Sequence, residues 1–400
     1  MALPRGHSAQ SQYIIGGRMC ALYTDPMSSS WNWRRCWPVA LVLAMLAFGQ
    51  PLLAQRPQDP LPRVHFVATG GTISNREGGR LSAEELVKSM PGVERFARLT
   101  HEQFANVASS ELSLAQWLAL SKRINELFAT DQELAGIVVT SGTDTLEETS
   151  FFLHLTVRDP RPVVVVGSMR NPSTVGYEGA ANLLQGVRVA ADPLSRNKGT
   201  LVVLNDEINS ARNVTKTDAL RLQTFRSREL GMLGVVDRDR VVYFNQITQR
   251  TNERLEFDIT KVTQLPRVDV IMVYQGAPAD LIKAAVDNGA RGIVIAVAGA
   301  GATSGDQSEG LTYAASKGVF IVTSTRSGSG RIAPPQQRPR DGGATDGGGG
   351  GFQLSPEQQR RRQFTIAGED HTPIKARVLL MVALTKTTER AELQRIFSEY

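Results

Sequence analysis

The clearest structural signal in the chain is the segment Val64-His65-Phe66-Val67-Ala68-Thr69-Gly70-Gly71-Thr72-Ile73. Its first five residues predict a buried strand that runs directly into a glycine turn. Glycines allow a ligand to approach the main chain closely, and open α/β folds bind ligands at the carboxyl edge of a parallel sheet. By itself, a glycine turn after a strand more often only ends the strand or forms a phosphate-binding loop. It lacks the Gly-Lys-Ser/Thr of a Walker loop and the third glycine of the dinucleotide fingerprint.

Further strands and helices alternate after this turn. Ser113 is expected to cap an amphipathic helix, another helix starts near Asp144, and a third covers about residues 179–191. Short apolar runs between them predict strands at residues 136–140, 163–166 and 201–204. Continuous apolar strands separated by helices predict an α/β fold with a parallel-type sheet covered by helices on both faces.

The chain of 400 residues is long enough for two domains. We predict a larger N-terminal α/β domain at residues 63–236, a charged connecting segment at 237–267, and a smaller C-terminal α/β domain at 268–400. The second domain repeats the strand and helix pattern, with strands at 268–273, 292–298 and 319–323 and closing helices near 373–384 and 389–397.

One stretch of the second domain, residues 327–362, is rich in proline, arginine and glycine. Such a composition buries too little apolar surface to order itself, so we predict a long mobile loop there.

The first 54 residues read as a leader rather than as part of the fold. Arg34 and Arg35 precede an apolar run at 38–48, and small residues follow up to Ala54. This pattern is typical of a signal peptide, and the run is too short to span a bilayer comfortably. We therefore predict a removed leader at 1–54, a linker at 55–62, a periplasmic or secreted bacterial protein and no stable membrane anchor.

Two starting residues of the leader stay open, Met1 and Met27, because a signal peptide that begins at Met27 has normal proportions. Both cysteines, Cys20 and Cys36, lie in the leader, so the mature protein would have no disulfide and no cysteine metal site.

Of the formal net charge of +6, +3 precedes residue 55. No predicted helix carries a dense Lys/Arg face, so the charge indicates no nucleic-acid partner.

Two more polar segments follow predicted strands. Thr140-Ser141-Gly142-Thr143-Asp144-Thr145 reads, by itself, as a helix N-cap. Val214-Thr215-Lys216-Thr217 contains a lone lysine, which in a polar loop is usually just solvated. Each segment is weak evidence for function when it is taken alone.

Taken together and in order, three segments resemble the active-site motifs of the bacterial L-asparaginase/glutaminase-asparaginase family, in its exported type. They are Thr69-Gly70-Gly71-Thr72-Ile73, Gly142-Thr143-Asp144-Thr145 and Val214-Thr215-Lys216-Thr217. The resemblance runs from about residue 63 to residue 400 and includes the closing Lys375-Ala376-Arg377-Val378-Leu379-Leu380. It implies an amidohydrolase that converts L-asparagine to L-aspartate and ammonia, without a metal or an organic cofactor.

The resemblance also implies catalytic roles for individual residues. Thr72 would attack the side-chain amide and form an acyl-enzyme. Thr143 and Lys216 would form a second hydroxyl–amine pair, in which a lysine kept neutral by burial accepts a proton. Asp144 would pair with the α-ammonium of the substrate. Backbone N–H groups, that of Thr143 among them, would face the oxyanion.

Substrate contacts and assembly follow from the same resemblance. Ser109 would contact the α-carboxylate, Ser110 stands beside it, and Gly71 would let the substrate approach the main chain. In this family the site forms between subunits, which implies a homotetramer.

The sequence departs from the family at four places. The short segment 74–81 has no tyrosine, although the family carries one on a lid there. Ser110 replaces a usual Gln or Glu, and Ser141 precedes Gly142 where His is commoner. Pro278 occupies roughly the place of an Asn that a neighbouring subunit lends to the site. In the family, the neighbouring subunit also lends an acidic residue to the site. Gln336 or Gln337 falls near the position of that residue in this chain, and Glu357 or Asp341 could reach back to the site instead.

Two alternatives stay open at this point. One is a dual glutaminase-asparaginase, because Ser110 leaves room near the α-amino group. The other is a secreted amino-acid-binding protein without catalysis, although a binder needs no hydroxyl pair beside an amine. Histidines suggest no metal site: His65 reads as a core or edge side chain, and the others, His101, His154 and His371 among them, show no paired ligand spacing.

Overall fold

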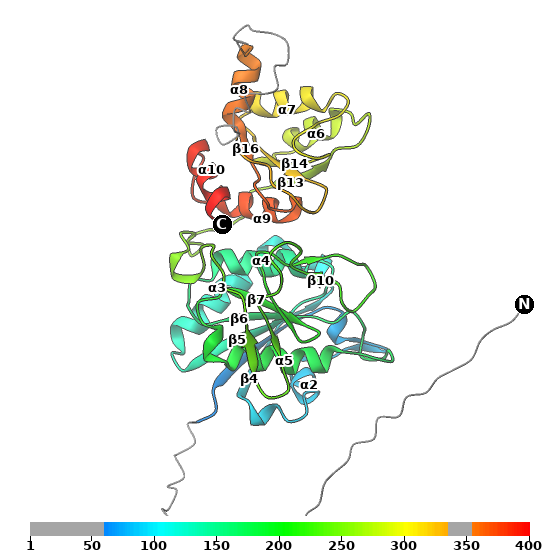
Figure 1. The fold of residues 1–400 in the computed structure, drawn as a ribbon, viewed down its shortest axis with the longest axis vertical. Helices are drawn as coiled ribbons and strands as arrows, with labels where there is room; N and C mark the ends of the chain where they lie inside the picture. The colour runs from blue at the N-terminus through cyan, green and yellow to red at the C-terminus, as the bar shows by residue number, and fades with distance from the viewer. Residues whose placement is uncertain (1–59, 335–353) are drawn as a thin grey trace, which may run out of the picture. The chain divides into compact units, whose positions relative to one another are not determined.

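The computed structural model describes residues 60–334 and 354–400 (Figure 1). The predicted leader at 1–54 and most of the predicted linker lie outside these residues, as do Gln336, Gln337 and Asp341. Within the described part of the chain, no helix combines the length and apolar character needed to cross a membrane.

The N-terminal domain is built on a large mixed sheet. Its strands are β1 (Arg63–Gly70), β4 (Arg98–Val107), β5 (Leu134–Thr140), β6 (Val163–Val166), β7 (Thr200–Leu204), β8 (Glu207–Ser210), β11 (Gly234–Val236) and β12 (Val241–Tyr243). Their order is β12-β11-β8-β7-β6-β5-β1-β4. The predicted α/β fold class is therefore confirmed.

Only part of this sheet is parallel. Strands β4, β1, β5, β6 and β7 run parallel, whereas β8, β11 and β12 pair antiparallel. The change of direction occurs at Asn205 and Asp206, whose φ angles of 51° and 64° form a tight reversal between β7 and β8. Asn and Asp are the side chains that tolerate this conformation best, so two residues suffice to make an antiparallel hairpin.

Helices cover both faces of the sheet, as predicted. They are α2 (Ala83–Lys88), α3 (Leu114–Thr130), α4 (Leu146–Thr156) and α5 (Gly179–Ala191). Successive strand residues alternate between the two faces: Phe66 packs in a core with Leu183 of α5, and Val67 packs in another with Ile124 of α3. Ser113 and Gln116 form a capping box that starts α3.

The C-terminal domain has a smaller, fully parallel sheet. Its strands are β13 (Val268–Met272), β14 (Gly292–Val297), β15 (Phe320–Thr325) and β16 (Thr365–Ala367), in that order. Its helices are α6 (Asp280–Asp287), α7 (Gln307–Ser316), α8 (Pro356–Phe364), α9 (Pro373–Ala383) and α10 (Arg390–Glu399). One core lies between the sheet and α6 and α7, and the other between the sheet and α9 and α10.

The two domains share the second of these cores. Phe151 and Phe152 of α4 belong to the same buried cluster as Val378 and Leu379 of α9. Helix α4 is therefore buried on nearly all sides, because it touches both the large sheet and α9. This contact links the helix that follows the Thr143 segment to the other domain.

Two segments differ from what composition suggested. The stretch 237–267, predicted to connect the domains, contributes β12 to the large sheet. Within 327–362, predicted to be a mobile loop, residues from Pro356 onward form α8. Ser355 caps this helix by accepting a hydrogen bond from the Gln358 backbone. Helix α8 carries no buried residue, so it has no apolar stripe from which the sequence could predict it.

Candidate active site

The glycine turn after β1 has a backbone that only glycine adopts easily. Gly70 and Gly71 have φ angles of 104° and 89°. A Cβ on Gly71 would lie 2.3 Å from the amide nitrogen of Gly142, and one on Gly70 would lie 2.5 Å from the carbonyl oxygen of Val107. The two glycines therefore bring this turn into direct backbone contact with its neighbours. Thr72 follows, half-buried, at the start of the single turn η2 (Thr72–Ser74).

Three predicted site segments meet at one edge of the large sheet. Strands β5, β1 and β4 are parallel neighbours, so their carboxyl ends lie side by side. Thr143 follows β5, Thr72 follows β1, and Ser109 follows β4 in the turn η4 (Ser109–Glu111). Ser109 packs against Gly142, where a Cβ would lie 2.7 Å from the Ser109 hydroxyl oxygen. Ser110 is exposed at the rim.

Hydrogen bonds between Thr69 and Thr140 also join the end of β1 to the end of β5. The Thr69 backbone N–H donates to the Thr140 hydroxyl at 2.9 Å, and the Thr69 hydroxyl donates to the Thr140 carbonyl at 2.5 Å. Both threonines are buried. The ends of β1 and β5 are thereby fixed relative to each other.

Lys216 reaches the site from β9 (Thr215–Lys216), which pairs with β10 (Phe225–Arg226). Its Nζ atom donates to the Thr143 hydroxyl at 3.1 Å and to the Asp144 carboxylate at 2.7 Å. The Lys216 side chain is 15% exposed, whereas that of Asp144 is 77% exposed. Solvent weakens the attraction between the Lys216 amine and a carboxylate that is this exposed. Asp144 therefore stays accessible to a ligand.

The residues predicted for a lid form a short hairpin, β2 (Asn75–Arg76) and β3 (Gly79–Arg80). From this hairpin the Arg80 guanidinium lies 3.5 Å from the carbonyl oxygen of Gly71. The Ser74 hydroxyl donates to the same oxygen at 3.1 Å. A cationic side chain therefore stands beside the turn in a segment that has no phenol. The Gly78-Gly79 pair is the sequence signal for this hairpin.

A tyrosine from outside the three motifs also supports the turn. The Tyr177 hydroxyl, just before α5, donates to the carbonyl of Ile73 at 2.9 Å. Burial raises the pKa of Tyr177 above its usual range, so the hydroxyl stays a neutral donor at any ordinary pH. This contact spans 104 residues of sequence, and no local pattern predicts it.

We expect Tyr177→Phe to lower kcat/KM for the amide substrate about fivefold, because it removes roughly 1 kcal/mol of support from the residue next to Thr72. Tyr243→Phe is the matched control. Its hydroxyl is 2.7 Å from that of Ser195, burial raises its pKa too, and it contacts none of the predicted site residues. Steady-state kinetics of both variants would test this, and equal kcat/KM values for the two would contradict it.

The remaining predicted positions are placed away from these contacts. Pro278 is exposed between β13 and α6, and Glu357 is exposed in the first turn of α8. Among residues 60–334 and 354–400, no cluster of three His, Cys, Asp or Glu side chains is arranged to hold a metal. His154 and His371 are buried, and burial lowers the pKa of each to about 3, so both are neutral.

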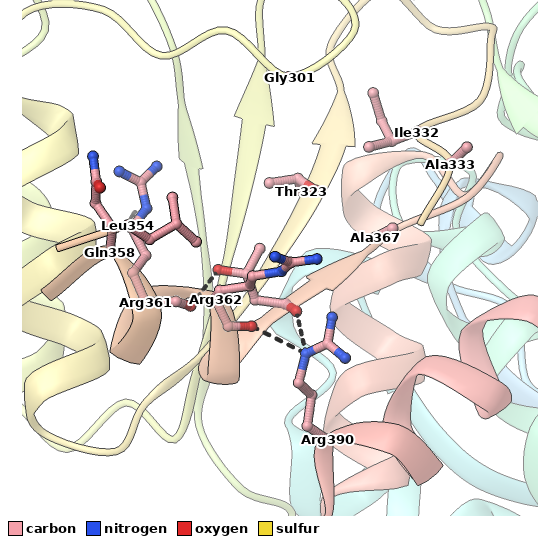
Figure 2. A pocket seen from close by; sticks show the side chains of 11 residues that line it. Gly301, Thr323, Ile332, Ala333, Leu354, Gln358, Arg361, Arg362, Ala367 and Arg390 are labelled. Carbon is pink, nitrogen blue, oxygen red and sulfur yellow. Dashed lines mark hydrogen bonds between the residues drawn. The ribbon is translucent and has the colours of Figure 1, made fainter. Parts of the chain in front are cut away.

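A separate cavity of about 350 Å³ lies in the C-terminal domain beside α8 (Figure 2). Arg361, Arg362 and Arg390 line it, and the Arg390 side chain donates to the carbonyls of Arg362 and Thr365. None of the predicted site residues lines this cavity. The candidate active site is therefore the sheet edge that carries Thr72, Thr143 and Lys216.

The fold and this site define a two-domain α/β protein with threonines at the carboxyl ends of two neighbouring strands, one of them hydrogen-bonded to a lysine amine. Family models match both halves: "Asparaginase, N-terminal" covers residues 63–249, and "Glutaminase/Asparaginase C-terminal domain" covers 267–397. The chain belongs to the asparaginase family, and it is an enzyme of that family.

Individual relatives agree with this assignment over most of their length. The chain is 40% identical over 351 residues to L-asparaginase 2 of Bacillus subtilis, covering 85% of this chain and 87% of that protein. It is 34% identical to the glutaminase-asparaginase of Pseudomonas fluorescens, covering 91% and 98%. A solved structure titled as a probable cytoplasmic L-asparaginase from Campylobacter jejuni is similar with a TM-score of 0.75 and 35% identity, covering 85% and 100%.

Proposed function

We propose that this chain hydrolyses the side-chain amide of L-asparagine to L-aspartate and ammonia, with Thr72 as the nucleophile. The observation that carries the proposal is the 3.1 Å contact between the Lys216 amine and the Thr143 hydroxyl, on a segment in backbone contact with the Thr72 turn. A hydroxyl beside an amine is suited to proton transfer, and a hydroxyl in a glycine turn is suited to attack on a carbonyl.

In the first half of the proposed reaction, the Thr72 hydroxyl oxygen bonds to the amide carbon. The C–N bond then breaks, and the proton lost by Thr72 leaves with the nitrogen as ammonia. In the second half, water attacks the resulting ester and gives one proton to the Thr143–Lys216 pair, which passes this proton to the Thr72 oxygen as the ester bond breaks. Backbone N–H groups, including that of Thr143, stabilise the oxyanion in both halves. The sum is amide plus water giving carboxylic acid plus ammonia.

The proposed substrate contacts use the residues around this pair. Asp144, exposed and ion-paired only with Lys216 among the described residues, would bind the substrate α-ammonium. Ser109, packed against Gly142, would bind the α-carboxylate. Ser110 lies beside it, and Gly71 would let the substrate approach the turn, whose Gly71 N–H already donates to Val107 and whose Gly71 carbonyl accepts from Ser74. Each contact is made by a group whose charge or polarity matches its partner.

A second candidate is a dual glutaminase-asparaginase. Ser110 is exposed and short, so it leaves space at the rim for one more methylene group. The Pseudomonas fluorescens relative is named for both substrates. The test is ammonia release from asparagine and from glutamine by the chain beginning at Gln55. Equal kcat/KM values for the two amides would rule out the asparagine preference.

The remaining alternative function is a secreted amino-acid-binding protein without catalysis. A binder gains nothing from a Lys216 amine hydrogen-bonded to the Thr143 hydroxyl, because this contact is suited to proton transfer and not to holding a ligand. Calorimetry with asparagine, run beside the ammonia assay, distinguishes the two. Binding by the wild-type chain with no ammonia released would establish the binding protein.

We further propose an N-terminal domain that extends from the predicted 63–236 to include β12, a connection through the rest of 237–267 to the 268–400 domain, a homotetramer with the site at a subunit interface, and export to the periplasm or medium after removal of residues 1–54. N-terminal sequencing of the mature protein would test the cleavage, and light scattering would test the assembly. A monomer with full activity would exclude the shared site.

A further inference from the structure

A buried lysine of the C-terminal domain lies close to the proposed catalytic lysine in the structure. Lys375, in the first turn of α9, is 2% exposed. Burying an ammonium group is costly, and a cation at a helix N-terminus is further disfavoured by the helix dipole. A side chain with two such penalties calls for a compensating set of contacts.

Those contacts all come from one loop of the N-terminal domain. Lys375 Nζ donates to the carbonyl oxygens of Ala211 at 2.8 Å, Arg212 at 2.9 Å and Val214 at 2.5 Å. An ammonium group has three N–H donors and no acceptor, so the three carbonyls use its full capacity. The loop leads directly into β9, and Lys216 is two residues beyond Val214.

Glu147 of α4 also contacts this strand. Its Oε1 atom accepts the backbone N–H of Lys216 at 3.2 Å. Its Oε2 atom is buried and has no hydrogen-bond partner among the described residues. Strand β9 and the loop that leads into it therefore receive contacts both from α4, which follows Thr143, and from α9 of the C-terminal domain.

The charged and titratable groups around Lys375 are few. Burial lowers the pKa of Lys375 to about 7. Glu147 and Asp370 oppose this shift, and Arg212 adds to it. The ring of Phe151 also faces the ammonium group, 5.6 Å away. His154 and His371 face the same region from α4 and from the loop before α9, and both are neutral.

We propose that Lys375 is a positioning residue, which fixes the loop at residues 211–214 so that the Lys216 amine stays within hydrogen-bonding distance of the Thr143 hydroxyl. The inference rests on the proposed role of Lys216. Through this contact the C-terminal domain sets the geometry of the proton-transfer pair in the N-terminal domain of the same chain.

The test compares Lys375→Met with Arg377→Met in the full chain. Methionine keeps the length of the side chain and removes its donors. Arg377 lies two residues further on the same helix and donates hydrogen bonds to Glu148 and to the Val268 carbonyl, not to the 211–214 loop. We expect K375M to lower kcat on the order of 100-fold, since a displacement of about 1 Å costs that much, with KM changed less than about threefold. R377M should keep kcat within about threefold of wild type.

Hydrogen exchange of the peptide spanning residues 208–217 gives a readout that does not depend on activity. We expect this peptide to exchange faster in K375M and at the wild-type rate in R377M. Unchanged exchange, or faster exchange with unchanged kcat, would overturn the proposal. If the wild type releases no ammonia, the proposed function fails, and the exchange comparison still decides whether Lys375 holds the loop.

Lys375→Gln serves if K375M does not fold. Its amide nitrogen has two donors and lies one bond nearer to the main chain, so it can satisfy at most two of the three carbonyls. We expect kcat and exchange between those of the wild type and a variant without donors. Wild-type kcat and exchange in K375Q would overturn the proposal in the same way.

Lys375 also gives the stability of the chain a pH dependence. Its pKa is about 7 when folded and 10.5 ordinarily, so the unfolded chain binds more protons between those values. Stability therefore rises with pH in this window, where the penalty of the buried charge is relieved. We expect the Tm of wild type minus that of K375M to increase from pH 7 toward pH 10.5. A constant difference across the window would contradict the assignment.

Discussion

Thr72→Ala is expected to abolish ammonia release from L-asparagine while the variant still binds the amino acid. The substitution removes the hydroxyl that forms the acyl-enzyme and leaves the Thr143–Lys216 contact and the Ser109 and Asp144 positions in place. Because no covalent intermediate can form, kcat should fall by at least about 10³-fold. A coupled ammonia assay measures the rate, and calorimetry with asparagine measures the retained binding.

Thr72→Ser is the control for this variant, because it restores an oxygen nucleophile at the same place and lacks only a methyl group. It should recover turnover well above that of Thr72→Ala, together with the slow accumulation of a covalent adduct visible by mass spectrometry. Turnover by Thr72→Ala within about tenfold of the wild type would mean that another group attacks the amide.

The parts of the fold that the sequence predicts best are those where apolar residues are continuous. The four valines of β6 and the helix α5 begin and end at the predicted residues. Strand β4 was not predicted, because Arg98–Val107 reads as a polar segment with mostly exposed or half-exposed side chains. Its pairing with β1 at the sheet edge fixes it, and this is a tertiary interaction that local pattern does not contain.

The antiparallel side of the large sheet begins at a dipeptide, Asn205-Asp206, that is typical of a tight turn. Asn205-Asp206 follows an apolar strand, and such a pair favours a two-residue reversal. The predicted strand stops at residue 204, so the prediction does not include β8, which pairs antiparallel with β7. The parallel expectation was therefore right for the strands that carry the site and wrong for the far edge.

The candidate site also has residues that the sequence predicts and residues that it does not. Residues Thr72, Thr143 and Lys216 stand in segments with recognisable composition, and the structure brings those segments together. The contacts of Tyr177 and Lys375 were not predicted, although Lys375 stands in the closing segment of the resemblance, because each side chain donates to a carbonyl more than a hundred residues away. The one local sign of Lys375 is that it stands, with Arg377, in the mostly apolar stretch of α9, and burial of its amine is visible only in the fold.

Thr143→Val and Lys216→Met are expected to reveal a single proton-transfer unit. Each change removes one end of the 3.1 Å contact between the hydroxyl and the amine. Proton transfer by a positioned group contributes about 10²–10⁴-fold, so each variant should lose kcat by that order. The double variant should be no slower than the slower single variant, because either loss already disables the pair.

Thr145→Val is the matched control, since its buried hydroxyl lies two residues from Thr143 and has no hydrogen-bond partner among the described residues. It should keep kcat near the wild-type value, which separates loss of the Thr143 hydroxyl from disturbance of the start of α4. The double-mutant cycle is read from single-turnover rates of acylation and deacylation. If the two losses multiply instead, Thr143 and Lys216 act in separate steps, and Lys216 would then serve mainly to hold Asp144 at 2.7 Å.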